Sequence, residues 1–332
     1  MQLKPNYNKY PFIPVRGMEE ACTTGWENIG NEIKGALKKS PAQRQVIVIE
    51  TYQGVLYDDL LATFEKLLSP EMVINTADLL YAEEKITEIT QPDVTDHRIF
   101  GYMTRLQMND LMDPNLTAAA LEKIHSYGAG LVLVFGYGAS LVWKHPDMLI
   151  YADMARWEIQ LRMRTNKVSN LGINNIDDHI EPKYKRGYFV DWRICDRLKK
   201  QIMERWDYVL DSNDPQNPKL VTGEALRKGL RQAAAQPFSV VPLFDPGPWG
   251  GQWMRDRFDL DKKPENFAWC FNCIPEENSM LLGFGATMFE IPSINLVFYQ
   301  ARQLLGEAVH ARFGDEFPIR FDFLDTMAGG NL

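Results

Sequence analysis

The sequence has few of the features on which disulfide-linked and membrane proteins depend. Its 332 residues include 4 cysteines, Cys22, Cys195, Cys270 and Cys273, which are too few and too scattered for a disulfide framework. Apolar runs are no longer than a strand, and residues 1–15 lack a basic start followed by a continuous apolar stretch. Neither a signal peptide nor a membrane-spanning helix is therefore expected. These absences favour a cytoplasmic protein.

Positive charge is also scarce. The 36 lysines and arginines are outnumbered by 44 aspartates and glutamates, which leaves a net charge of -8. A chain with this balance repels polyanions. We therefore expect neither nucleic acid nor an acidic membrane as a partner. The length favours two domains, with enough residues to bury a core in at least one of them.

The CxxC motif formed by Cys270 and Cys273 is not expected to bind zinc. Its surroundings, NFAWCFNCI, alternate as a strand does, and residues three apart on a strand lie on opposite faces. A structural zinc would need two further ligands at suitable spacing. His310 stands without convergent partners in the sequence, so we expect it to be an ordinary helix or loop residue. The sequence thus predicts no metal site in this chain.

Two parts of the chain differ in the pattern of secondary structure that they predict. The first two thirds alternate short apolar strands with amphipathic helices, which predicts an α/β domain over residues 1–235 with a three-layer, mostly parallel sheet. From residue 236 to 332 we expect a β-rich unit, with two strands around Gly283–Gly285 and a third over Ile294–Tyr299. The strands and helices predicted in the first part are Val46–Glu50, Asp58–Ser69, Met72–Asn75, Asp113–Gly128, Leu131–Phe135, Asp147–Tyr151, Ala155–Arg164, Asp191–Arg205, Tyr208–Asp211 and Thr222–Ala235.

The turn after the first of these strands lacks the parts of a phosphate-binding loop. It reads ETYQGVLYDD, Glu50–Asp59, with one glycine and no lysine. Backbone amides cannot curl around a phosphate there, and the β- and γ-phosphate charges would go unneutralised. We therefore expect no phosphate transfer from ATP. The order of elements resembles a nucleoside kinase-like P-loop fold without its catalytic loop, so a nucleotide-handling phosphotransferase relative stays as an alternative function.

A second glycine loop, FGYGAS, follows the strand Leu131–Phe135. It lacks the third glycine of a dinucleotide-binding fingerprint, and a tight turn accounts for it. Because ligands bind at the carboxyl edge of open α/β sheets, Gly136, Gly138 and Ser140 are also a candidate site for a small anion. The two interpretations stay open.

The segment Lys183–Arg205 is basic within an acidic protein. On its helix Ile194, Leu198 and Ile202 form the apolar stripe, so we expect most of the charges to face solvent. The alternative is a lid or groove for a phosphorylated ligand.

The segment PLFDPGPWGGQWM, Pro242–Met254, carries a more specific motif. Its Trp249, Gly250 and Gly251 resemble the Trp-Gly-Gly of class I mannose-6-phosphate isomerases, in the bacterial form with an extra N-terminal α/β domain. NFAWCF, around Trp269, resembles the next strand of that family. The resemblance extends through the end of the chain, at Leu304, Leu305, Gly306, Arg312, Phe313, Gly314, Phe317, Pro318, Phe323, Leu324, Asp325, Asn331 and Leu332.

This resemblance implies a cupin-like unit and an aldose–ketose isomerase of mannose 6-phosphate and fructose 6-phosphate. Zinc serves that family as a Lewis acid, and Trp249, Gly250 and Gly251 would lie near the substrate. The family's first zinc ligands come from a Gln-x-His-Pro segment after Asn-Leu, and this sequence stops at Leu332. The resemblance therefore implies the front part of an isomerase, inactive alone, without zinc and without identified catalytic residues.

Two positions depart from the family's pattern. Asp322 stands where the family has a lysine, and Asn266–Ala268 replace a Gly-Glu before the strand tryptophan.

A barrel short of strands would also expose a sheet edge, which favours a homo-oligomer. A non-catalytic ligand-binding or scaffold protein is the remaining alternative.

Overall fold

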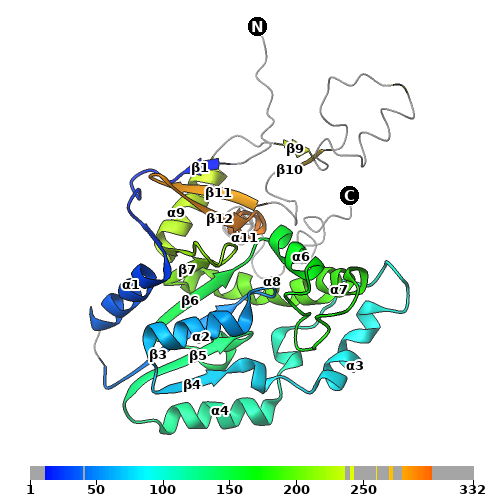
Figure 1. Ribbon diagram of the computed structural model, residues 1–332, viewed down its shortest axis with the longest axis horizontal. Coiled ribbons are helices and arrows are strands. Elements are labelled where there is room, and N and C mark those ends of the chain that lie inside the picture. Colours follow the sequence, from blue (N-terminus) through cyan, green and yellow to red (C-terminus); the bar gives the residue numbers. More distant parts are fainter. Residues whose placement is uncertain are drawn as a thin grey trace, which may run out of the picture. The chain divides into compact units, whose positions relative to one another are not determined.

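The computed structural model describes residues 12–39, 42–235, 240–242, 259, 269–271 and 279–300. The chain divides into two compact units, Glu20–Leu226 on one hand and Met1–Glu19 with Arg227–Leu332 on the other. Figure 1 shows the course of the chain and the labels of its elements. The larger unit holds a seven-stranded sheet, and the other holds the strands near both ends of the chain.

The sheet of the larger unit is mixed but mainly parallel. Its strand order is β2-β8-β7-β6-β3-β5-β4, in which the five strands from β7 to β4 run parallel and β8 and β2 continue the edge antiparallel. The predicted α/β class is therefore confirmed. The strands are β2 (Cys22–Thr24), β3 (Arg44–Thr51), β4 (Met72–Asn75), β5 (Gly130–Gly136), β6 (Met148–Asp153), β7 (Tyr208–Asp211) and β8 (Lys219–Thr222).

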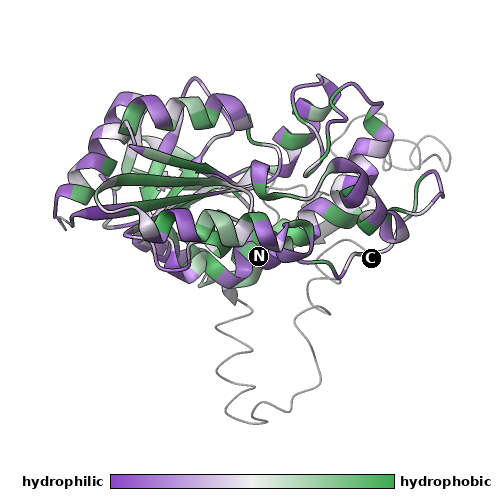
Figure 2. Ribbon diagram, turned by 90° about the horizontal axis from the view of Figure 1, so that it is seen from below, coloured by the Kyte–Doolittle hydropathy of each residue, from purple (hydrophilic) through white to green (hydrophobic). Residues whose placement is uncertain are grey.

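The central strands are continuous apolar runs because both faces of the sheet are covered. Val46–Ile49 in β3 and Val132–Phe135 in β5 are buried, and Val48 pairs with Val134 in the ladder. Figure 2 shows these hydrophobic strands between layers of helices whose outer sides are hydrophilic. When both faces of a parallel sheet are covered, polar functional side chains lie at the carboxyl ends of its strands.

The helices of the larger unit begin and end at local signals. Asp113 caps one of them by accepting hydrogen bonds from the backbone N–H groups of Asn115 and Leu116, at 2.8 and 3.2 Å, with Pro114 in the first turn. The α-helices are α1 (Trp26–Lys39), α2 (Tyr57–Leu68), α3 (Glu83–Val94), α4 (Pro114–Ser126), α5 (Ala139–Val142), α6 (Arg156–Arg164), α7 (Ile180–Arg186), α8 (Trp192–Ile202) and α9 (Gly223–Ala234), the last crossing into the second unit.

Shorter helical turns complete the larger unit. They are η1 (Thr76–Leu79), η2 (Met108–Leu111), η3 (Gly187–Asp191) and η4 (Met203–Arg205), of which η3 is a π-helix. The helix predicted over Asp191–Arg205 thus starts earlier than expected, because α7, η3 and α8 follow one another without a break. None of the described helices is both long and apolar enough to cross a membrane.

In the second unit the start of the chain pairs with its C-terminal third. β1 (Phe12–Pro14) runs parallel to β11 (Ser279–Phe284), which forms a hairpin with β12 (Thr287–Pro292) around the predicted Gly283–Gly285 turn. β9 (Val240–Pro242) and β10 (Trp269–Phe271) pair antiparallel.

One predicted strand of this unit is wrong. Residues Ile294–Tyr299 were expected to extend, but Ile294–Gln300 is the helix α11. Ile294, Leu296, Phe298 and Tyr299 are all buried. A short apolar run that is buried on all sides has the same pattern in a strand and in a helix, so periodicity alone could not decide between them.

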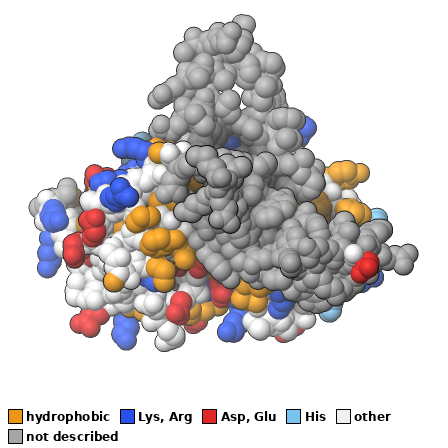
Figure 3. Space-filling view, turned by 90° about the horizontal axis from the view of Figure 1, so that it is seen from above, with side chains coloured by type: hydrophobic (Ala, Val, Ile, Leu, Met, Phe, Trp, Pro, Cys, Tyr) orange, Lys and Arg blue, Asp and Glu red, His pale blue; other side chains and the backbone are white. Residues whose placement is uncertain are grey.

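Several residues singled out in the sequence lie outside the described part of the chain. These are Trp249, Gly250, Gly251, Cys273, His310 and the motif residues from Leu304 to Leu332. On the face shown in Figure 3, the described acidic and basic side chains are interspersed. A mixed distribution of this kind is typical of a solvent-exposed surface.

Candidate functional site

Polar side chains gather where the parallel strands of the larger unit end. Glu50 and Thr51 close β3, Asp153 closes β6 and Asp211 closes β7, and all four are buried. Carboxyl ends of parallel strands meet at one edge of a sheet, and ligands of open α/β folds bind there. This edge is therefore the candidate functional site.

Glu50 is held by the glycine loop that follows β5. Its Oε1 accepts a hydrogen bond from the Gly138 N–H at 2.7 Å, and its Oε2 accepts from the Ser140 N–H at 2.8 Å and the Ser140 hydroxyl at 2.7 Å. The donors that the sequence suggested for a small anion thus bind a carboxylate of the chain itself. Burial raises the pKa of Glu50 to about 7, although these hydrogen bonds partly oppose the rise.

Gly136, the third residue of the candidate anion site, has a different surrounding. Its φ is +120°, and a Cβ at this position would lie 1.9 Å from Tyr57 Oη and 2.5 Å from Thr76 Oγ1. The Tyr57 hydroxyl donates to Asn75 Oδ1 at 2.6 Å. Only glycine allows this close approach, so Gly136 serves the packing of Tyr57 against the end of β5.

A buried ion pair lies beside the end of β3. The guanidinium of Arg156, at the start of α6, donates to Asp196 on α8, and the Tyr52 hydroxyl donates to the same carboxylate at 3.0 Å. The Arg156 guanidinium also lies over the Trp192 ring, 5.3 Å from its centroid. Burial by itself would raise the pKa of Asp196, but the charges of Arg156, Arg193 and Lys199 outweigh it and hold that pKa below the ordinary value.

Lys199 forms a second buried pair in the same region. Its Nζ donates to Asp153 Oδ1 at 2.7 Å and lies 4.6 Å from the ring centroid of Tyr52 and 5.5 Å from that of Tyr151. Both members of the pair are at most 2 % exposed. A carboxylate together with two aromatic faces replaces the water that the ammonium loses on burial.

Most cations of the basic segment are therefore buried, although we expected most of them to face solvent. Lys183, Lys185, Arg186, Arg193 and Lys199 are at most 8 % exposed. Lys183 Nζ, for example, donates to Asn166 Oδ1 at 2.8 Å and to the Ile176 carbonyl at 2.7 Å, while Arg186 pairs with the buried Asp191 at 3.3 Å. The expectation was wrong because helical periodicity identifies the apolar face but not what packs against the polar one.

A cavity of about 490 Å³ opens at this edge of the sheet, beside the ends of β3 and β5 and the start of α2. Within the described part of the chain, the side chains of Asp58, Tyr81, Glu83, Lys167 and Asn174 line it and make no hydrogen bond or ion pair there. The other lining residues are Val55, Tyr57, Ala77, Leu80, Ala82, Tyr137, Val168, Ser169, Asn170, Gly172, Ile173 and Ile176. Unlike the buried pairs, these polar groups are available to a ligand.

Sequence reasoning missed most of this arrangement. Glu50 appeared only as the end of a strand, although a single carboxylate at the end of a buried apolar run was a signal that it needs donors. The Arg156–Asp196 pair joins positions 40 residues apart, and no local pattern connects them. Tyr81 and Lys167 lie in loops that the sequence analysis did not single out.

Metal binding was predicted to be absent from this chain. Among the described residues there is no group of three or more histidines, cysteines, aspartates and glutamates that could hold a metal ion. The resemblance would place the family's first zinc ligands in a Gln-x-His-Pro segment after Asn331 and Leu332, which this sequence does not contain. The zinc prediction therefore stays a prediction.

Comparison with known proteins places the larger unit in a family. No curated protein matches the sequence. The model of a family described as "Domain of unknown function (DUF8485)" matches residues 25–235, more than half of the chain. The match includes all five parallel strands, Glu50 and its glycine loop, the buried Arg156–Asp196 and Lys199–Asp153 pairs and the cavity. The chain therefore belongs to the DUF8485 family.

Proposed function

We propose that the α/β unit is a non-catalytic ligand-binding domain that takes an uncharged polar ring compound, a nucleoside or a sugar. The observation that supports it best is the cavity at the carboxyl edge of the sheet, whose volume of about 490 Å³ lies in the range of small-molecule sites. Tyr57, Tyr81 and Tyr137 offer aromatic surface to a ring, and Asn174 and Asp58 offer hydrogen-bonding groups.

The charges around the cavity favour a neutral ligand. Among the described lining residues there are two carboxylates, Asp58 and Glu83, and one cation, Lys167. This balance repels a triphosphate. The turn between β3 and α2 also has no lysine, and the donors of the loop after β5 are occupied by Glu50. These features support binding without phosphate transfer.

Titration calorimetry of the full chain tests this proposal with adenosine, uridine, mannose and glucose. We expect at least one of them to bind with a Kd below ~1 mM, and Tyr81→Ala and Asp58→Asn to weaken binding about tenfold. Asp59→Asn, at the exposed neighbouring position on α2, is the control and should leave the Kd unchanged. Binding of none of the four would refute the ligand site. Magnesium-dependent ATP turnover that Glu50→Ala abolishes would refute its non-catalytic character.

We also propose that the chain is a relative of the mannose-6-phosphate isomerases. This second proposal rests on the sequence resemblance at Trp249, Gly250 and Gly251 and the motifs that follow in the same order. A catalytic zinc needs about three protein ligands, and the family takes them from a Gln-x-His-Pro segment and later residues. The metal would act as a Lewis acid on the sugar's oxygens.

Metal analysis and an isomerase assay test the second proposal. The dialysed 332-residue chain should hold well under one zinc per chain and fail to interconvert mannose 6-phosphate and fructose 6-phosphate. A version extended by a segment with Gln-x-His-Pro and the later ligands should bind zinc and gain activity. Stoichiometric zinc with turnover in the 332-residue chain would overturn the expectation that its zinc ligands are missing. An extended version without zinc and without activity would overturn the isomerase assignment.

A further inference from the structure

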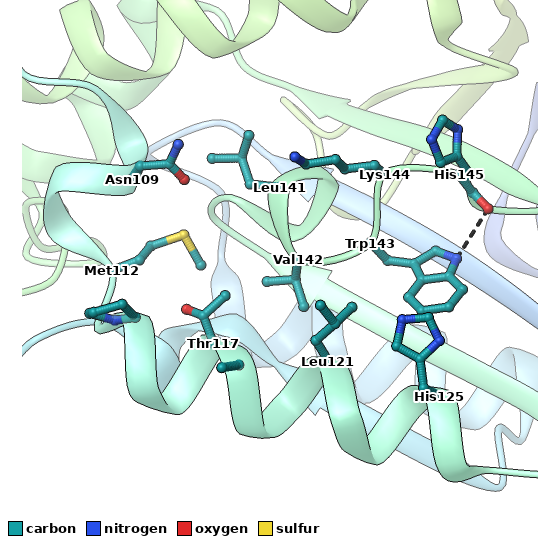
Figure 4. A pocket seen from close by; sticks show the side chains of 12 residues that line it. Asn109, Met112, Thr117, Leu121, His125, Leu141, Val142, Trp143, Lys144 and His145 are labelled. Carbon is teal, nitrogen blue, oxygen red and sulfur yellow. Dashed lines mark hydrogen bonds between the residues drawn. The ribbon is translucent and has the colours of Figure 1, made fainter.

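A second cavity, of about 610 Å³, lies on the larger unit beside α4 (Figure 4). None of its lining residues lines the cavity at the carboxyl edge of the sheet. The connection from β5 to β6 explains why it exists. A crossover between parallel strands usually carries a full helix, but this one carries only the four residues of α5. Within the described part of the chain, α4 therefore has the short α5 beside it in place of a helix of its own length.

The floor of this cavity is apolar. Met112 and Val142 are buried, and Leu121 and Leu141 are half-buried. Figure 4 shows Leu121 rising from α4 and Leu141 and Val142 facing it from the other side. Surfaces of this kind give an apolar ring or chain a place out of water.

Trp143 forms a wall that is held in place before any ligand arrives. Its indole N–H donates to the His145 carbonyl at 3.1 Å, which is the dashed line in Figure 4. The ring of His125, on α4, packs against it with 4.9 Å between centroids, and the Arg44 guanidinium lies 5.5 Å from the indole centroid. Binding of a ligand against this ring therefore costs little side-chain conformational entropy.

Each polar side chain at this cavity can donate a hydrogen bond. Within the described part of the chain, the side chains of Lys144 and Asn109 make no hydrogen bond or ion pair, and the buried Thr117 Oγ1 has no hydrogen-bond partner. Figure 4 shows the Lys144 side chain extended along the upper side of the cavity and the Thr117 hydroxyl on its lower side. Among the described residues that line the cavity there is no aspartate or glutamate, so none of them is a counter-ion for Lys144.

We propose that this cavity binds a small amphipathic carboxylate, with its chain or ring on the apolar floor and against Trp143 and its carboxylate beside Lys144. Asn109 and Thr117 supply further donors to the anion. A neutral amphiphile would gain nothing from the exposed lysine, and a cationic one would be repelled by it. The selectivity for an anion over its neutral analogue is thus the distinguishing property of the site.

Octanoate, octanol and octyltrimethylammonium are the probes, titrated into the full chain and followed by calorimetry. We expect one octanoate per chain with a Kd below ~1 mM, and octanol and the ammonium at least tenfold weaker. Lys144→Ala should weaken octanoate about tenfold and leave octanol unchanged. Lys123→Ala removes an exposed lysine of α4 that does not line the cavity, and it should change neither Kd.

A second variant locates the binding. Ala118 lines the cavity from the exposed side of α4, so Ala118→Trp should fill it and abolish octanoate binding while the chain keeps its thermal midpoint. The proposal is overturned if octanoate does not bind, or binds no more tightly than octanol. It is equally overturned if octanoate binding survives Ala118→Trp, or if Lys144→Ala leaves the octanoate Kd unchanged.

Discussion

Replacing Asp196 by alanine is expected to lower the free energy of unfolding by about 3 to 5 kcal/mol. The carboxylate accepts hydrogen bonds from Arg156 and Tyr52, and the side chains of Asp196 and Arg156 are 9 % and 0 % exposed. The substitution removes the carboxylate and leaves the guanidinium charge buried. Urea denaturation at pH 7 measures the loss, since the lowered pKa of Asp196 keeps it ionised there.

An exposed pair of the same chemistry is the matched control. Arg98 and Glu181 lie 3.1 Å apart, but their side chains are 78 % and 51 % exposed. Glu181→Ala should therefore cost less than about 1 kcal/mol. If Asp196→Ala does not fold at all, Asp196→Asn keeps the shape without the charge and should still lose more stability than Glu181→Ala. Equal losses at the buried and exposed pairs would contradict the argument.

Replacing Glu50 by glutamine is expected to change how stability depends on pH. Burial raises the pKa of Glu50 from 4.5 to about 7, so the folded state holds a proton that the unfolded state has released over this interval. The wild-type chain should therefore lose stability as pH rises from 4.5 to about 7, by roughly 3 kcal/mol from this group. Glu50→Gln cannot titrate and should lack this part of the slope.

Unfolding free energies measured between pH 4 and pH 8 test this expectation. The slope is the quantity to compare, because the glutamine amide also faces the Gly138 and Ser140 donors and lowers stability at every pH. Glu65→Gln, at an exposed position of α2, is the control and should keep the wild-type slope. A Glu50→Gln slope as steep as that of the wild type would show that the carboxyl group titrates alike in both states.

Local signals were enough to predict most elements of the α/β unit. The buried strands β3 and β5 are continuous apolar runs, and α4 begins at Asp113 and Pro114, where capping and fixed backbone angles act within a few residues. The alternation of strands and helices was sufficient for the class. The run Ile294–Tyr299 shows the limit of such signals, since a short buried apolar segment carries no period that distinguishes helix from strand.

By itself the sequence determined the class of the larger unit, the net negative charge of the whole chain and the lack of a phosphate-loop lysine. Each of these follows from composition or from residues that are neighbours in the sequence. Only the tertiary structure decided which charged side chains are buried and which partners they bind. Glu50 meets Gly138 across 88 residues, and Lys199 meets Asp153 across 46. Such pairs form where strands and helices that are distant in the chain pack together and exclude water. No local sequence pattern indicates which two charged residues will become partners.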